Sequence, residues 1–355
     1  MSAEPSMSTE PSTPAEPSIS ARPRAPRRVL VTGATGFLGG HAVREFLAEG
    51  DEVIAAGRSL PALERLATVG AETIAADLAD LATLPVRADV LVHSAALSSP
   101  WGRWSEFREA NVDGTEAMVG LAERVGIPRI VFVSSPSIYS ARRHQHLVRE
   151  DEFDPAGRMS LYIRSKIEAE RLLQRALAEG RIRELVILRP RGLIGVGDPS
   201  LIPRFVAANR RRGIPLFDGG RNVVDVTCVE NAARALVLAA ATEHADGSVY
   251  NITNGEPTPF GELLRAFFAA MGEEPRFLTV DLRLLTAVAE VLERVYARLP
   301  GGAEPPFTRY TVATLAYAQT LDISRARAEL GYEPVVPLAE GIRRVGEHYR
   351  AASRA

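Results

Sequence analysis

A tyrosine and a lysine, four residues apart, are the side chains of this sequence best suited to move a proton. Tyr162 and Lys166 lie in a stretch with helical periodicity, where residues at this spacing share one face of the helix. A cationic lysine beside the phenol favours the phenolate and so lowers the pKa of the tyrosine. Such a tyrosine can act as a general acid or base on a carbonyl or an alcohol. Alone, the pair also fits an ordinary exposed helix, so its meaning depends on the rest of the chain.

A glycine-rich loop upstream gives the pair its context. Val29–Thr32 is a short apolar run, and Gly33, Gly36 and Gly39 follow it at the start of an amphipathic helical pattern. In a dinucleotide-binding turn the first glycine permits the tight turn, the second lets the backbone approach a pyrophosphate and the third lets the helix pack on the strand. Free N–H groups at the helix start hold the phosphates. The loop therefore predicts a bound dinucleotide.

Strand-like runs alternate with helical patterns from Arg28 onward, which indicates parallel strands joined by helices. We expect an α/β fold, a Rossmann doubly wound parallel sheet with a smaller C-terminal substrate-capping domain. Ligands of such sheets bind at the carboxyl ends of the strands. The strand-like runs are Arg28–Thr32, Glu52–Ala56, Thr73–Ala76, Val90–His93, Arg129–Val133 and Glu184–Leu188. The helical patterns between them include Gly39–Glu49, Trp104–Val125 and Leu161–Ala178.

The chain is expected to divide into a tail and two folded regions. Residues 1–26 are polar and proline-rich, which predicts a disordered tail without the apolar core of a secretory signal. Residues 27–190 form the expected NAD(P)-binding domain, with a return segment at 223–250, and residues 191–355 form mainly the substrate-binding domain. We interpret Leu282–Leu299 as an amphipathic helix packed on the core. A weak membrane-surface contact, or a lid over an apolar substrate, is the alternative.

The composition excludes several classes of function. With 46% hydrophobic and 24% charged residues and a net charge of −2, the chain has no general attraction to nucleic acid or anionic membranes. Its one cysteine, Cys228, excludes an internal disulfide, is interpreted as a buried structural thiol and fits a cytoplasmic location. No apolar run is long enough to span a membrane. His144 and His146 lack a third ligand nearby, so we expect no metal site.

Residues after the second and third strand-like runs bear on which dinucleotide binds. Arg58 stands where NAD enzymes usually carry an acidic residue for the ribose 2′-hydroxyl, and an arginine can pair with a 2′-phosphate instead. We therefore expect NADP to be preferred, with NAD as a second possibility and a solvated arginine as the alternative interpretation. Asp77 and Leu78 follow the third run. The carboxylate could accept from an adenine amine, but an ordinary turn aspartate explains it nearly as well.

Polar residues near two other strand ends could contact the reacting oxygen. Asn111 lies on the helix after the fourth strand-like run, where its amide could bond the backbone or hold a proton-relay water. Ser134, Ser135 and Ser137 end the fifth run. One of these hydroxyls would face the Tyr162 helix and steady a substrate oxygen.

Taken in order, these motifs resemble the extended short-chain dehydrogenase/reductase superfamily from residue 28 to about residue 350. More narrowly, the chain resembles the 3β-hydroxysteroid dehydrogenase/isomerase-like branch, and within it bacterial 2-alkyl-3-oxoalkanoate reductases. The segments that carry the narrower likeness are His93-Ser-Ala-Ala96, Trp101-Gly102, Ser134-Ser-Pro-Ser-Ile-Tyr139, Arg189-Pro-Arg-Gly-Leu-Ile-Gly195, Asn251-Ile-Thr-Asn-Gly-Glu-Pro257 and Pro305-Pro-Phe-Thr308.

The resemblance implies a role for each matching residue. Ser135 would hydrogen-bond the reacting oxygen, Tyr162 would be the acid/base, and Lys166 would bind the nicotinamide ribose and tune Tyr162. Asn111 completes the set of catalytic candidates. The residues expected to line the cofactor beside the glycines are Thr35, Phe37, Leu38, Ala95, Ala96 and Pro190.

We therefore expect an NAD(P)-dependent oxidoreductase, working as a homodimer, that interconverts a secondary alcohol and a ketone on an apolar substrate of the 3β-hydroxysteroid or β-keto acid type. A nucleotide-sugar epimerase or dehydratase on the same scaffold is the first alternative, with a diphosphate held by basic residues of the C-terminal region. A dinucleotide-sensing regulator without turnover is the second, although the intact Ser135, Tyr162 and Lys166 argue against it. The basic residues in question are Arg204, Arg210, Arg211, Arg212 and Arg221.

Overall fold

The computed structural model describes residues 25–157, 159–299 and 303–352. The tail expected at residues 1–26 lies almost entirely outside these ranges. Within them, no helix combines the length and the apolar character needed to cross a membrane.

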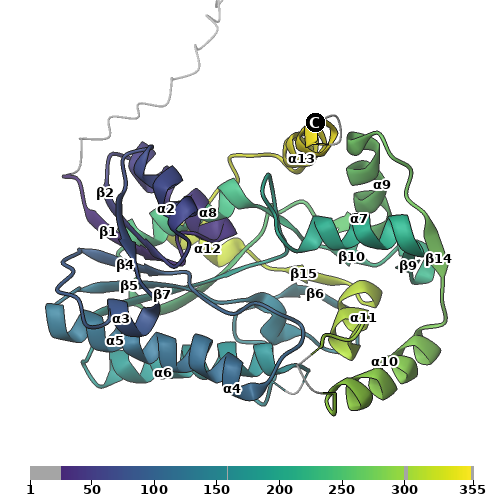
Figure 1. The fold of residues 1–355 in the computed structure, drawn as a ribbon, viewed down its shortest axis with the longest axis horizontal. Helices are drawn as coiled ribbons and strands as arrows, with labels where there is room; N and C mark the ends of the chain where they lie inside the picture. Colours follow the sequence, from purple (N-terminus) through teal and green to yellow (C-terminus); the bar gives the residue numbers. More distant parts are fainter. Residues whose placement is uncertain (1–24, 158, 300–302, 353–355) are drawn as a thin grey trace, which may run out of the picture.

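A seven-stranded parallel sheet forms the centre of the fold, in the order β12-β7-β5-β4-β1-β2-β3 (Figure 1). Its strands are β1 (Arg28–Thr32), β2 (Glu52–Gly57), β3 (Glu72–Ala75), β4 (Val90–His93), β5 (Arg129–Val133), β7 (Glu184–Pro190) and β12 (Asp246–Ile252). The predicted doubly wound sheet is thus confirmed, and the six predicted runs match its first six strands to within two residues at each end.

Helices cover both faces of this sheet, because successive residues of each strand point to opposite sides. Val29 and Val31 belong to one apolar core, and Leu30 between them belongs to the other. The first core is closed by α1 (Phe37–Ala48), α2 (Leu60–Ala67), α8 (Val229–Ala241) and α12 (Ser324–Leu330). The second is closed by α3 (Leu78–Leu81), α5 (Gly114–Val125) and α6 (Leu161–Ala178), which Figure 1 shows along one side of the sheet.

Two elements differ from the sequence expectation. The seventh strand, β12, was not among the predicted runs, and its pairing with β7 shifts in register between Asp246 and Ser248. The single helix expected over Trp104–Val125 is instead α4 (Trp104–Phe107), a π-helix η1 (Arg108–Asp113) and α5. Each π-helical turn takes in one more residue than an α-helical turn, so the apolar pattern continues while the geometry changes.

The remaining elements form the C-terminal lobe and its connections. Its helices are α7 (Leu201–Arg211), α9 (Phe260–Met271), α10 (Leu282–Tyr296), α11 (Arg309–Ala316) and α13 (Leu338–Ala352). Its strands and short turns are η2 (Pro136–Tyr139), β6 (Gln145–Val148), β8 (Leu193–Ile194), β9 (Ile214–Leu216), η3 (Asp218–Gly220), β10 (Val223–Val224), β11 (Thr227–Cys228), β13 (Thr258–Pro259), β14 (Phe277–Thr279) and β15 (Gln319–Leu321). Most of the helices lie to one side of the central sheet in Figure 1.

Helix α10 only partly fits its predicted description. Its inner face packs against α11 through Leu285 and the buried Ala289. Leu284, Val288 and Val291 nevertheless point to solvent, with Leu284 62% exposed. The lobe therefore leaves an apolar stripe of this helix uncovered among the described residues.

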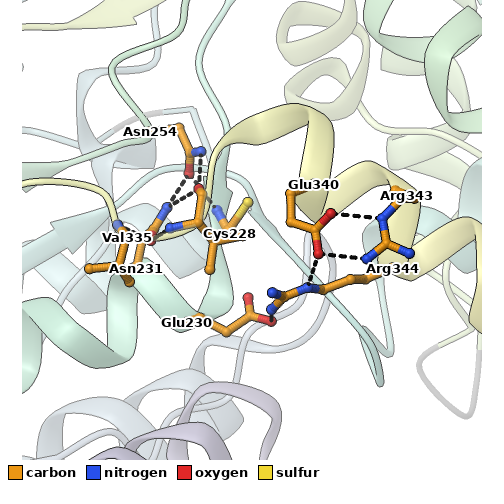
Figure 2. A network of polar contacts seen from close by, with 9 residues as sticks. Cys228, Glu230, Asn231, Asn254, Val335, Glu340, Arg343 and Arg344 are labelled. Carbon is orange, nitrogen blue, oxygen red and sulfur yellow. Dashed lines mark hydrogen bonds and ion pairs between the residues drawn. The ribbon is translucent and has the colours of Figure 1, made fainter.

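A network of buried amides ties the segment before α13 to helix α8 (Figure 2). The amide Nδ2 of Asn231 donates to Asn254 Oδ1 at 2.9 Å, and its Oδ1 accepts from the backbone of Val335 at 2.8 Å. Asn254 Oδ1 also accepts from the backbone N–H of Cys228. Cys228 is fully buried, as expected, and a Cβ on Gly341 would lie 2.4 Å from its sulfur. These contacts fix α13 on the return part of the Rossmann fold.

Candidate active site

The Tyr162 hydroxyl lies where the carboxyl ends of two neighbouring strands meet. Helix α6 begins beyond Ser160, whose hydroxyl accepts from the backbone N–H of Ile163 at 3.1 Å and so caps the helix. Tyr162 stands in the first turn, and hydrogen bonding from Ser135, after β5, and Ser98, in the loop after β4, acts to lower its pKa. The structure therefore brings the predicted pair Ser135 and Tyr162 together and adds Ser98.

Among the three strand-end serines, Ser135 is the one that faces the tyrosine. Its Oγ lies 2.8 Å from Ser137 Oγ, so the two hydroxyls form a short chain that ends at Tyr162. The Ser134 hydroxyl is buried and has no hydrogen-bond partner in the described part of the chain. This geometry favours Ser135 over Ser134 for contact with a reacting oxygen.

Lys166 is buried one helical turn beyond Tyr162. Its ammonium donates to the backbone carbonyl of Val133 at 2.8 Å and lies 4.7 Å from the centre of the Phe132 ring. Burial lowers the pKa of Lys166 to about 8, although the Glu170 carboxylate opposes this shift.

The expected lowering of the Tyr162 pKa is not what the structure gives. Burial of the phenol raises the pKa of Tyr162 above its ordinary value, although the hydrogen bonds from Ser135 and Ser98 oppose the shift. The Lys166 ammonium does not lower the pKa of Tyr162, because it points toward the Val133 carbonyl at the end of β5. A shared helix face predicts a close contact between the two side chains, but the buried lysine finds a backbone partner instead.

Asn111 acts on the loop after β4. Its carboxamide accepts from the backbone N–H of Leu97 at 2.7 Å and donates to the Leu97 carbonyl at 3.0 Å and to the Ser165 hydroxyl at 2.8 Å. Of the two roles expected for this amide, the structure favours bonding to the backbone. Because Leu97 precedes Ser98 and Ser165 precedes Lys166, Asn111 holds both sides of the candidate site.

Three glycines shape the loop between β1 and α1. A Cβ on Gly33 would lie 2.7 Å from the backbone of Ala95, and Gly33 has a φ of +67°. A Cβ on Gly39 would lie 2.1 Å from the carbonyl oxygen of Gly33. A Cβ on Gly36 would meet only that same oxygen, at 3.1 Å. The first and third glycines thus serve close packing, and the second keeps the backbone accessible.

The first N–H groups of α1, at Phe37, Leu38 and Gly39, have no partner within the helix, because a helix start leaves its first donors free. With the positive end of the helix dipole, these donors suit a phosphate. The side chain of Leu38 is buried in the core, so its backbone is the part available to a ligand. The loop therefore fits the dinucleotide that the sequence predicts.

Side chains at the following strand ends border the same loop. Thr35 packs on Gly57 at the end of β2, and Arg58 follows Gly57 as an exposed residue with no ion pair or hydrogen bond among the described residues. Asp77 Oδ1 accepts from the backbone N–H of Asp80 at 2.8 Å and caps α3. Asp77 is therefore a turn residue that caps a helix, as the alternative interpretation expected. Its second carboxylate oxygen stays available to other partners.

The remaining cofactor candidates lie at the same edge of the sheet. Ala95 and Ala96 follow β4, and the Ala95 backbone contacts the glycine loop. Pro190 ends β7. Leu78 packs against Gly114, where a Cβ would lie 2.6 Å from its side chain.

Comparison with known proteins identifies the scaffold. The sequence pattern of the NAD dependent epimerase/dehydratase family matches residues 29–253. The chain belongs to this family.

Two relatives named for an enzymatic activity are 33% and 30% identical to this chain. The 2-alkyl-3-oxoalkanoate reductase of Stenotrophomonas maltophilia (strain K279a) is 33% identical over 329 residues, which cover 90% of this chain and 98% of the relative. The 3-beta-hydroxysteroid dehydrogenase of Mycolicibacterium neoaurum is 30% identical over 328 residues, which cover 87% of each chain. The solved structure of MoeE5 in complex with UDP-glucuronic acid and NAD is 26% identical, with a TM-score of 0.70, and the match covers 92% of this chain and 99% of MoeE5.

These relatives confirm the expected extended short-chain dehydrogenase/reductase, its Rossmann fold and its class as an oxidoreductase. In this family member two residues near the site escaped the sequence analysis. Ser98 lies between His93–Ala96 and Trp101-Gly102, two segments that indicated only the family resemblance. Tyr310 comes from α11, far along the chain. The only sequence signal for Ser98 is its position after β4, and for Tyr310 its nearness to the matching segment Pro305–Thr308.

The basic residues of the epimerase alternative do not converge in this family member. All five are exposed, and three of them pair with carboxylates of their own surroundings: Arg204 with Glu304, Arg210 with Glu273 and Arg221 with Asp218. Within the described residues, no group of three histidine, cysteine, aspartate or glutamate side chains could hold a metal ion.

Proposed function

We propose that this protein is an NADP-preferring oxidoreductase that interconverts a ketone and a secondary alcohol on an apolar carbon skeleton. The observation that carries the proposal is Tyr162 at the start of α6, which packs on η2 directly after Ser135, at the sheet edge that also holds the glycine loop. The names of the two relatives, a 3-oxoalkanoate reductase and a 3-beta-hydroxysteroid dehydrogenase, support a substrate of this kind.

The proton and the oxygen are handled by side chains of this chain. In the reducing direction Tyr162 gives its phenol proton to the carbonyl oxygen, and in the oxidising direction it takes a proton from the alcohol. Its raised pKa keeps the phenol protonated at neutral pH, which suits the reducing direction. Ser135 and Ser98 donate to the same oxygen and orient it. A bound nicotinamide would supply or accept the hydride.

The dinucleotide would lie along the edge formed by the glycine loop and the ends of β2 and β4. The free N–H groups of α1 would hold its phosphates, and Lys166, at the end of β5, would hold the ribose next to Tyr162. Arg58 supports the preference for NADP, because an exposed guanidinium without an acidic partner can pair with a 2′-phosphate. The homodimer and the cytoplasmic location expected from the sequence stay predictions.

A turnover panel tests this proposal. The purified protein is incubated with NADPH or NADH and with a 3-ketosteroid, a 3-oxo acid or UDP-glucose, and the loss of reduced cofactor or the change in sugar is followed. We expect reduction of at least one apolar ketone, faster with NADPH. Faster conversion of UDP-glucose than of every ketone would replace the proposal with an epimerase. Cofactor binding without any turnover would favour a regulator.

A further inference from the structure

Arg189 and Arg191 stand on either side of Pro190 at the end of β7. Their guanidinium groups differ in whether they have a charged partner. The guanidinium of Arg189 is buried against the Glu170 carboxylate, with its closest contact at 2.6 Å. It also donates to the Tyr139 hydroxyl at 2.6 Å. Arg189 is therefore a structural residue whose charge is fully compensated.

Arg191 has no such partner. Its Nε is buried without a hydrogen bond, and no ion pair or side-chain hydrogen bond of its guanidinium occurs in the described part of the chain. Only its backbone is bonded, to Ile252 and Thr227. A buried N–H donor of a cation that lacks a partner is costly, so a ligand that brings a negative charge would be favoured there.

A small pocket beside Arg191 carries positive charge. Arg143 and Gln145 line it on one side, and Thr314 and Tyr317 of α11 line it on the other. Its volume is about 10 Å³, roughly the space of one water molecule. No carboxylate lines it, so the pocket offers donors to an anion.

Tyr310 connects this pocket to the catalytic tyrosine. It shares a face of α11 with Thr314 and Tyr317, because these residues are four and seven positions further along the helix. Its ring packs on the apolar cluster of Tyr139 and Ile163, and Ile163 follows Tyr162 directly in α6. Arg191 follows β7, the strand that pairs with β5, so it lies at the same carboxyl edge of the sheet as Ser135.

The carboxylate that acts on Arg191 is already engaged elsewhere. Asp225 Oδ2 accepts from the backbone N–H of Leu321 at 2.7 Å, and burial raises the pKa of Asp225 to about 6. No ion pair joins it to Arg191 among the described residues. Asp225 thus balances the guanidinium only from a distance.

We propose that Arg191 binds a carboxylate of the substrate and makes the site selective for 3-oxo and 3-hydroxy acids over neutral ketones and alcohols of the same skeleton. The inference rests on the proposed function and assigns a specificity-determining residue to it. A guanidinium presents two parallel N–H groups that match a carboxylate. In a 3-oxo acid a single carbon separates the carboxylate from the carbonyl, so both groups would fall within one site.

Oxidation of a 3-hydroxy acid and of its methyl ester by NADP⁺ tests the inference. For the parent protein we expect kcat/KM to favour the acid by ~10–100-fold, the range for a hydrogen bond to a charged group. Arg191→Met should abolish this preference through a raised KM for the acid, while the ester is unaffected. Arg191→Lys should keep part of it. Arg211→Met, which removes an exposed arginine of α7, serves as the control and should change neither substrate.

A binding measurement separates this inference from the proposed function. A saturated alkanoic acid and its amide, neither of which can react, are titrated into the NADP⁺-bound protein by calorimetry. Binding of the acid alone, lost in Arg191→Met while thermal unfolding shows a folded variant, supports the inference even if no alcohol is oxidised. Equal binding of acid and amide, or an equal loss of acid and ester turnover in Arg191→Met, would overturn it. Turnover of acid and ester that is equally independent of Arg191 would overturn the inference and leave the proposed function standing.

Discussion

The carboxyl edge of the central sheet and the α10–α11 part of the C-terminal lobe differ in how completely they are packed. At the sheet edge His93, Asn111 and Lys166 are at most 3% exposed, and each has hydrogen-bond partners. In α10 only Ala289 is fully buried, and Val291 is 56% exposed.

This difference indicates a division of labour. Groups that move a proton need fixed positions, which rigid strands and helices provide better than loosely packed segments do. Groups that select a substrate can tolerate a looser setting. We therefore expect substitutions at the sheet edge to reduce the turnover of every substrate alike. Substitutions of residues that face the C-terminal lobe should reduce the turnover of some substrates only.

The largest effect should come from Tyr162→Phe. The substitution removes the transferable proton and leaves the ring, so turnover should fall by ~10²–10⁴-fold with acids and neutral ketones alike. Steady-state kinetics on both classes, with NADPH binding followed by fluorescence, would check this. Binding of the cofactor should persist. Tyr296→Phe on α10 is the matched control, and a loss confined to one substrate class would break the proposed division.

Arg58→Ala should have an intermediate effect that is confined to the cofactor. A lost charged hydrogen bond corresponds to ~10–100-fold in affinity, so NADPH should bind more weakly by this factor while NADH is unchanged. Dissociation constants for the two cofactors, measured for the parent and the variant, give the ratio. An unchanged ratio, or a parent that prefers NADH, would show that Arg58 is only a solvated strand-end residue.

A third prediction concerns the pH dependence of stability. The pKa of Lys166 is lowered to about 8, whereas in the unfolded chain it returns to the ordinary value of 10.5. Between these values the unfolded chain binds a proton that the folded chain has released. Through this residue the free energy of unfolding therefore rises with pH, by at most ~1.4 kcal/mol per pH unit. Below pH 8 the buried charge opposes folding.

Denaturant unfolding of the cofactor-free protein and of Lys166→Met between pH 8 and 10 would measure this slope. The variant should lack the Lys166 contribution, so the difference between the two proteins should change steadily over the window. A constant difference would mean that Lys166 keeps its ordinary pKa and that the sheet edge is less closed than its packing indicates.

Much of the fold was predictable because buried parallel strands such as β1 and β5 are continuous apolar runs. Strand β12 was not predicted, because it begins with Asp246, Gly247 and Ser248, which are typical turn residues. The π-helix also escaped, since one extra residue in a turn leaves the apolar pattern of Trp104–Val125 almost unchanged.

For the candidate site, local spacing predicted that one of Ser134, Ser135 and Ser137 would face Tyr162, and the family resemblance selected Ser135. Neither pointed to Tyr310, which the tertiary fold brings onto the apolar cluster of Ile163, next to Tyr162 in the chain. Spacing also misjudged Lys166, because a shared helix face does not say which neighbour a flexible ammonium will choose. Contacts between distant elements, and competition among partners, decide such details.

The π-helical turn at Arg108–Asp113 has a consequence for how this protein can change over time. A π-turn holds one residue more than the α-helix around it, so the helix can lose a residue there without turning its two ends relative to each other. Deleting one residue would return the turn to α-helical spacing, and Phe107, whose ring centre lies 6.3 Å from that of Tyr162, would keep its place. Asn111 lies inside the turn, so the same deletion would shift its amide away from Leu97. A change of length at this point is therefore tolerated by the helix but releases the loop that carries Ser98.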